Sequence, residues 1–249
     1  MNNTGAIFIK QFTSLLKVPS MIIQGIMFLL IAGAIIFFIG EDEVRDCDTC
    51  IPAYVCAVCE EEANARFELP IPSQVGLFTV IFIGLSLIGS ASALVFEDKT
   101  TTNLRFMAMA DVKPYQYLLG TVSSMIIVVA VMLVFYALLG GYFGSNMFWF
   151  MAVGVSGGIV SILLGVVIGL SKIPIIATPL SLILGLGPTF ANLNETLANI
   201  LRFTFIQQVN IAISDLDADL TSSFLIIGVN GVVVLSLFII MHRKNKFNV

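Results

Sequence analysis

Four cysteines are the residues of this chain whose spacing could do chemistry. Cys47 and Cys50 form one Cys-x-x-Cys pair, and Cys56 and Cys59 form a second pair after a gap of five residues. Four thiolates would suit a structural zinc ion, although the gap is shorter than in zinc ribbons. We prefer two disulfides, Cys47 with Cys59 and Cys50 with Cys56, nested around a turn at Pro52. Zinc and free thiols are the alternatives.

A second polar stretch, residues 96–120, lies between two long apolar runs. It contains Glu97, Asp98, Lys99 and Arg105, and it is the longest charged segment on the basic side of the chain. We expect an ordered cytosolic loop here. Such a loop is what a membrane protein needs if it is to take mechanical work from a soluble partner.

The elements that carry these residues are predicted to be membrane spans. Hydrophobic residues make up 58% of the 249-residue chain and charged residues 11%, against about 25% charged in soluble domains. Runs of about 20 apolar residues predict helices that cross the bilayer. The sequence therefore indicates an all-α polytopic membrane protein with a single domain over residues 1–249. The six expected spans are 21–40, 74–96, 117–140, 147–170, 173–190 and 222–241.

Residues 1–18 precede the first span and predict an amphipathic helix that lies in the membrane interface. Phe8 and Phe12 share its apolar face, while Lys10 and Lys17 lie on the opposite face of the helical wheel. We therefore expect membrane lipid to be the partner of this helix.

Three further segments lie between the spans. Residues 41–73 are hydrophilic and hold the cysteines, and residues 97–116 form the charged loop. Residues 191–221 carry apolar side chains at helical spacing among Asn, Glu and Gln, which predicts one or two short re-entrant helices.

The distribution of Lys and Arg fixes the expected orientation. With the N-terminus inside, nine Lys and Arg residues fall on the cytosolic side and three outside. Cytosolic loops carry an excess of Lys and Arg, so both termini are predicted to be cytosolic. The cysteine segment is then outside, where the redox environment favours disulfides.

The middles of the predicted spans hold no Asp, Glu, Lys, Arg or His. Proton- and ion-coupled carriers generally need such groups within the membrane, so their absence argues against a proton-driven carrier. It also argues against an intramembrane protease. The single histidine, His242, falls in the basic tail. No Gly-x-x-x-x-Gly-Lys-Ser/Thr sequence occurs, so ATP, if it drives the protein, binds another subunit.

The fourth predicted span repeats small residues every four positions, at Gly157, Ser161, Gly165 and Gly169. This spacing allows two helices to approach closely in lipid. Packing within one subunit is the preferred interpretation, and a sliding interface is the alternative.

The architecture resembles the permease subunits of type-2 ABC exporters, the ABC-2 family, which has the type V exporter fold. The similarity covers essentially the whole chain. Its features are the interfacial helix, the long loop after the second span, the short fifth span with re-entrant helices, and the basic tail. The residues that match the family's loop pattern are Glu97, Asp98, Thr100, Thr101, Thr102, Leu104, Pro114, Tyr117, Leu118, Leu119 and Gly120. Thr121 stands where a lysine is usual, and the glycine of a Gly-Thr pair is missing.

The resemblance implies how the chain would work. Two copies of an ABC ATPase subunit, which bind ATP and Mg²⁺, would pair with two permeases, either two copies of this chain or this chain and a sister subunit. A loop helix near residues 101–110 and the N-terminal helix would rest on the ATPases. The residues implied at that contact are Glu97, Asp98, Leu104, Arg105 and Met107.

The expected activity is ATP-driven export of a hydrophobic or amphipathic cargo, such as a drug, lipid or membrane-active peptide, across a bacterial plasma membrane. The chain itself is not expected to be an enzyme, to carry a cofactor other than the possible zinc, or to bind nucleic acid. The alternative is a non-transporting accessory, immunity, metal or redox protein that uses the cysteines.

Overall fold

The structure is a computed structural model that describes residues 3–17, 20–40, 71–101, 103, 109, 112–171, 174–191, 195–216 and 220–245. Every regular element in these ranges is helical. The prediction of an all-α fold is therefore confirmed for the described part of the chain.

The first two helices are α1 (Asn3–Lys17) and α2 (Ser20–Gly40). A long helix follows as α4 (Ile71–Ile81), a π-helical turn η3 (Phe82–Leu87) and α5 (Ile88–Thr100), which continue one another without a break. The charged loop then leads to the paired helices α7 and α8. Their bounds are Pro114–Leu139 and Ser145–Leu170.

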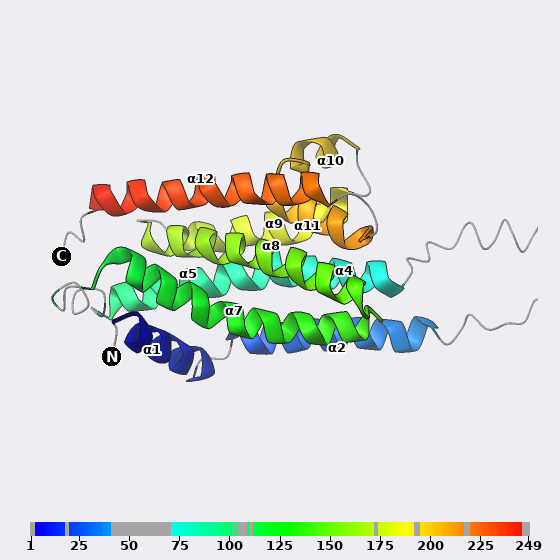
Figure 1. Cartoon of the computed structure of the whole chain (residues 1–249), viewed down its shortest axis with the longest axis horizontal. Helices are drawn as coiled ribbons and strands as arrows, with labels where there is room; N and C mark the ends of the chain where they lie inside the picture. Colours follow the sequence, from blue (N-terminus) through cyan, green and yellow to red (C-terminus); the bar gives the residue numbers. More distant parts are fainter. Residues whose placement is uncertain are drawn as a thin grey trace, which may run out of the picture.

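The tight turn between α7 and α8 depends on glycine. Gly141 and Gly144 have φ angles of 70° and 62°, in the left-handed region that side chains other than glycine rarely adopt. The turn makes α7 and α8 antiparallel neighbours (Figure 1).

A short 3₁₀ turn, η4 (Pro174–Ile176), leads into α9 (Ala177–Ala191), an apolar helix of 15 residues. Two short helices follow, α10 (Glu195–Leu201) and α11 (Phe205–Ser214). They fall in the segment where one or two short helices were predicted. The last helix is α12 (Thr221–Asn245).

Successive long helices run back and forth along the bundle. The start of α1, the end of α5, the start of α7 and the end of α12 lie at the same end of it (Figure 1). The start of α4 and the helices α10 and α11 lie at the opposite end. We call these the terminal end and the far end of the bundle.

Four helices are long and apolar enough to cross a membrane: Gln74–Thr100, Pro114–Leu139, Ser145–Leu170 and Thr221–Met241. The bent pair Thr4–Leu15 and Ser20–Ile35 makes a fifth candidate if it is counted as one span. α9 is apolar but short for a bilayer about 30 Å thick. The described residues thus support four spans by length and composition, or five with the bent pair.

The small residues of α8 pack against the second long helix. A Cβ atom on Gly165 would lie 2.6 Å from the carbonyl oxygen of Ile88, and one on Gly169 would lie 2.7 Å from that of Ser92. Ser161 is fully buried in the same row. The glycines therefore bring two backbones of one subunit together, as the preferred interpretation of the sequence had it.

Candidate functional site: a buried carboxylate at the terminal end

The most densely bonded polar group in the described part of the chain is Asp98, in the last turn of α5. Its side chain is 7% exposed. The helix ends just after it, where the hydroxyls of Thr100 and Thr101 donate to the carbonyl oxygen of Glu97 at 3.0 and 2.7 Å. The same carbonyl oxygen accepts from the Thr101 N–H at 2.9 Å, so three donors meet at the last turn of the helix. They fix the turn that carries Asp98.

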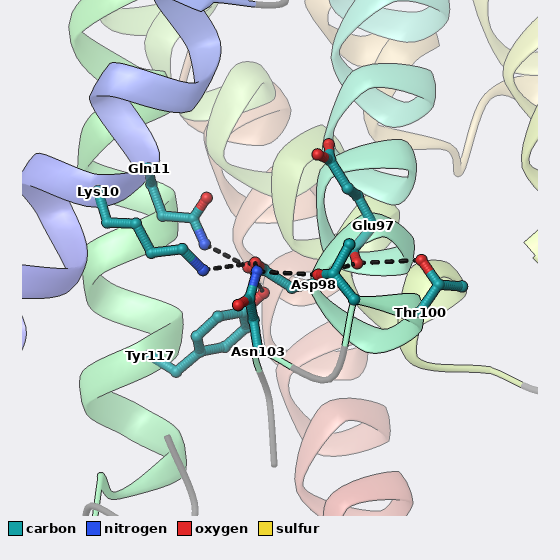
Figure 2. Close-up of polar contacts among 8 residues, drawn as sticks. Lys10, Gln11, Glu97, Asp98, Thr100, Asn103 and Tyr117 are labelled. Atoms are coloured by element: carbon teal, nitrogen blue, oxygen red, sulfur yellow. Dashed lines mark hydrogen bonds and ion pairs between the residues drawn. The ribbon is translucent and has the colours of Figure 1, made fainter. Parts of the chain in front are cut away.

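Each oxygen of the Asp98 carboxylate accepts two hydrogen bonds. Oδ1 accepts from Lys10 Nζ at 2.6 Å and from Asn103 Nδ2 at 3.3 Å. Oδ2 accepts from Gln11 Nε2 at 2.6 Å and from the Tyr117 hydroxyl at 3.0 Å. Figure 2 shows these side chains converging on the carboxylate. We call the five residues the Asp98 cluster.

The cluster joins three helices that are far apart in sequence. Lys10 and Gln11 come from α1, Asp98 from α5, and Tyr117 from the first turns of α7. Asn103 adds the start of the loop between α5 and α7. The cluster is thus a joint between the N-terminal helix and the ends of two long helices.

Local sequence positions each partner. Pro114 begins α7, a favoured place for proline, and Gln116 Oε1 accepts from the Lys113 N–H at 3.0 Å. Farther along α7, a Cβ on Gly120 would lie 2.7 Å from Ile7 Cγ2. The missing side chain lets α1 lie close against α7. That close approach brings Lys10 and Gln11 within reach of Asp98.

The electrostatics favour a closed structural joint over a ligand site. A carboxylate has about four lone-pair positions, and four donors fill them here. A buried charge is tolerated when it is paired and hydrogen-bonded, and Lys10, 38% exposed, supplies the opposite charge. No acceptor capacity is left for a metal ion or substrate.

A second connection leaves α5 from the next residue. Lys99 Nζ donates to the carbonyl oxygen of Ser171 at 2.9 Å and to that of Leu170 at 3.4 Å. These carbonyls lie at the C-terminus of α8, where the helix dipole also stabilises a nearby cation. Asp98 and Lys99 therefore tie the end of α5 to α1, α7 and α8 together.

Glu97 behaves differently from its neighbour. It is exposed, and its carboxylate makes no ion pair with any side chain in the described ranges. Figure 2 shows it pointing away from the Asp98 cluster. The side chains of the two adjacent acids thus point in different directions. Asp98 holds the joint together, and Glu97 faces outward beside it.

The other predicted site residues divide into two groups. Phe8 and Phe12 stack on α1 with ring centroids 5.9 Å apart, and both are half-buried. Lys17 ends α1, but its side chain lies outside the described part. Also outside the described residues are Leu104, Arg105, Met107, Cys47, Cys50, Cys56 and Cys59. Within the described ranges, no three His, Cys, Asp or Glu residues gather as metal ligands.

Sequence reasoning missed part of the joint. The helical wheel placed Lys10 on the polar face of α1, away from the apolar face, yet its ammonium reaches a buried carboxylate. The buried stripe of α1 is Ile7, Gln11 and Leu15, at 5%, 0% and 5% exposure. That spacing of four residues could have indicated an inward-facing Gln11. Tyr117 was noted only as a match to the loop pattern, and Asn103 gave no signal.

No family model, curated protein or solved structure matches the chain, so its function is inferred from its own residues.

Proposed function

We propose that this chain is the membrane-spanning permease subunit of an ATP-driven exporter of the ABC-2 type. In this proposal α2, the α4–η3–α5 helix, α7, α8, α9 and α12 are its six spans. α10 and α11 form the re-entrant segment. The alternating run of these helices and the shared position of the start of α1 and the end of α12 support this assignment (Figure 1).

The charge distribution supports a cytosolic terminal end. Lys99 and Lys113 flank the loop there, and the basic tail follows α12. Arg202 lies between α10 and α11 at the far end. An excess of Lys and Arg marks the cytosolic side of a membrane protein.

The observation that carries the proposal is the Asp98 cluster. It ties the N-terminal helix to two long helices at the terminal end through a carboxylate saturated by four donors. A force applied to α1 or to the loop would reach α5 and α7 directly. Through Lys99 it would also reach α8. An exporter driven by a separate ATPase needs such a rigid transmission point.

The ATPase subunits, two per complex, would bind ATP and Mg²⁺ and press on this end of the permease. Glu97 is the exposed acid beside the joint, and we assign it to the ATPase contact together with Arg105 of the loop. The second permease is a copy of this chain or a sister subunit. The cargo is a hydrophobic or amphipathic molecule, because the spans consist mainly of apolar side chains.

The first test is purification from the native membrane. The tagged chain should bring down a soluble ATPase. In proteoliposomes the complex should hydrolyse ATP faster when given an amphipathic peptide, a lipid or a cationic drug. A complex that contains no ATPase, or a purified chain that moves cargo down a proton gradient, would overturn the proposal.

The coupling contact has its own test. Glu97→Lys and Arg105→Glu should each lower cargo-stimulated ATP hydrolysis at least about fivefold, the lower range of typical coupling between sites. Basal hydrolysis and assembly should be unchanged. Arg202→Glu, an exposed charge reversal at the far end, is the matched control and should leave stimulation intact. Normal stimulation in both loop variants would remove these residues from the contact.

A further inference from the structure

The second long helix contains a π-helical turn, η3, near its middle. The turn covers Phe82–Leu87, and five of its six residues are buried. A π turn contains one more residue than an α turn. Such turns are rare in proteins, and those that occur are often found at functional sites. It divides the helix into α4 on the far side and α5 on the terminal side.

The π turn leaves a buried hydroxyl without a hydrogen bond. Ser86 Oγ is fully buried and has no partner, whereas Thr79 and Ser124 in comparable helices donate to backbone carbonyls at 2.8 Å. Buried polar groups in native proteins are almost always bonded, so each exception calls for an explanation. Ser86 lies within the turn, so the unbonded hydroxyl and the π-helical geometry occur at the same place.

A second unbonded hydroxyl lies on the neighbouring helix. Ser161 Oγ of α8 is also fully buried without a partner. Positions on either side of it in α8 contact the π turn and its end, since Gly157 faces Ile83 and Gly165 faces Ile88. Ser161 therefore lies alongside the turn, and two unsatisfied hydroxyls occur in one stretch of the bundle.

The residue of α9 that faces the π turn at its closest contact is a glycine. A Cβ on Gly84 would lie 2.6 Å from Gly185 Cα, and a Cβ on Gly185 would lie 2.9 Å from Leu85 N. Backbone therefore meets backbone at this contact. The two glycines allow this close approach, and the same position on α9 also lies near a side-chain atom, with Leu85 Cβ 3.1 Å from a Cβ on Gly185.

Both halves of the helix pack on α9, and each half also has neighbours of its own. α5 is tied to α8 by Gly165, Gly169 and Lys99, and to α1 and α7 by Asp98. α4 packs on α11, where a Cβ on Gly76 would lie 2.7 Å from Ile213 Cγ2. α8 also packs on α11, where a Cβ on Gly157 would lie 2.5 Å from Val209 Cγ2, so a change in the π turn must shift that contact as well.

We propose that η3 is a mechanical joint in which the extra residue passes along the helix. Each step rotates the side chains between the old and new positions by about 100°, because an α-helix has 3.6 residues per turn. Ser86 then changes its surroundings, and α5 with α8 reorients relative to α4 with α11. This inference concerns motion within the chain and does not depend on which partner drives it.

The test uses the full chain in lipid nanodiscs with a ¹⁹F probe. Trifluoromethyl-phenylalanine replaces Phe78 on α4 or Phe96 on α5, in separate samples, and Phe135 on the lipid-facing side of α7 is the control. ¹⁹F saturation transfer should reveal a second state at Phe78 or Phe96, populated to about 1–10%, and one state at Phe135. A single state at both Phe78 and Phe96 would overturn the proposal.

Deleting one residue should remove the joint. Leu85 is the one member of the turn that is not buried, and its deletion leaves the five residues that suit a continuous α-helix. The variant should keep the Asp98 cluster and show a single ¹⁹F state. Persistence of both states would contradict the proposal. If the variant does not fold, the wild-type measurement alone decides.

Discussion

At the scale of single residues, Asp98 is the polar residue of the described part on which the most side-chain hydrogen bonds converge. Four donors from two helices and a loop meet its two oxygens. Hydrogen bonds to a charged group contribute about 1.5–3 kcal/mol, and removing one partner of a buried pair costs more than the pair contributes. The free energy of unfolding should therefore depend strongly on this one carboxylate.

Asp98→Asn should lower the free energy of unfolding by about 2–3 kcal/mol. The amide keeps the shape of the side chain but offers one acceptor oxygen to four donors, and it leaves the Lys10 ammonium without an opposite charge. Equilibrium unfolding in mixed SDS micelles measures the change. The estimate is lower than for a fully buried pair because Lys10 is partly exposed.

Glu97→Gln is the matched control, because it changes the adjacent exposed acid in the same way. Its effect should stay within about 0.5 kcal/mol, as for other surface substitutions. Combining Lys10→Gln with Asp98→Asn should show a coupling energy of about 1 kcal/mol or more. Equal effects of Glu97→Gln and Asp98→Asn would mean that the cluster is not the stabilising joint.

At the scale of helices, the hydropathy of the sequence predicts where each helix lies. It predicts less well where the helix begins and ends and how its interior is wound. Each predicted span coincides with a helix, but the second helix runs from Ile71 to Thr100, beyond the apolar run of residues 74–96. The extension exists because hydrogen bonds at Glu97 and the Asp98 cluster hold polar residues in the last turn. A hydropathy pattern carries no information about hydrogen-bond partners that come from distant segments of the chain.

The π turn had no signal in the sequence. Phe82–Leu87 reads as an apolar run with one glycine and one serine, as in many spans. It coincides with the close contact of Gly84 with Gly185, which depends on the placement of α9. The glycines of α8 were different, since their spacing of four residues predicted a close packing face. The sequence shows a local periodicity of small residues directly, but it does not show how a contact with a distant helix changes the winding of a helix.

Gly165→Ala should destabilise the protein by about 1–3 kcal/mol, the usual cost of overpacking. The added methyl would lie 2.6 Å from a backbone oxygen and 2.7 Å from Ala91 Cβ, so α5 and α8 must separate. Gly228→Ala on α12, with nothing within 4 Å, is the control and should be neutral or stabilising by up to about 1 kcal/mol. Unfolding in SDS micelles ranks the two variants, and equal stability would argue against the close α5–α8 contact.

At the scale of the whole molecule, the bundle is asymmetric in charge between its ends. The terminal end carries the Asp98 cluster, Lys99 and the basic tail, while the far end carries α10 and α11 with Arg202. If the terminal end is cytosolic, the joint and the exposed Glu97 are accessible to a soluble ATPase. The orientation thus decides whether the proposed coupling is geometrically possible.

Cysteine labelling in cells measures that orientation. The four native cysteines are first replaced by serine. Met109→Cys then supplies one thiol in the loop after α5, and Phe203→Cys supplies one between α10 and α11. The native side chains at these positions are 65% and 72% exposed. A membrane-impermeant maleimide should label the Phe203 variant in intact cells and the Met109 variant only in inverted vesicles, because the positive-inside rule orients the terminal end toward the cytosol. The reverse pattern would put the Asp98 cluster outside, beyond the reach of any cytosolic ATPase. The residues of the joint would then be structural, and the export proposal would fail with the topology.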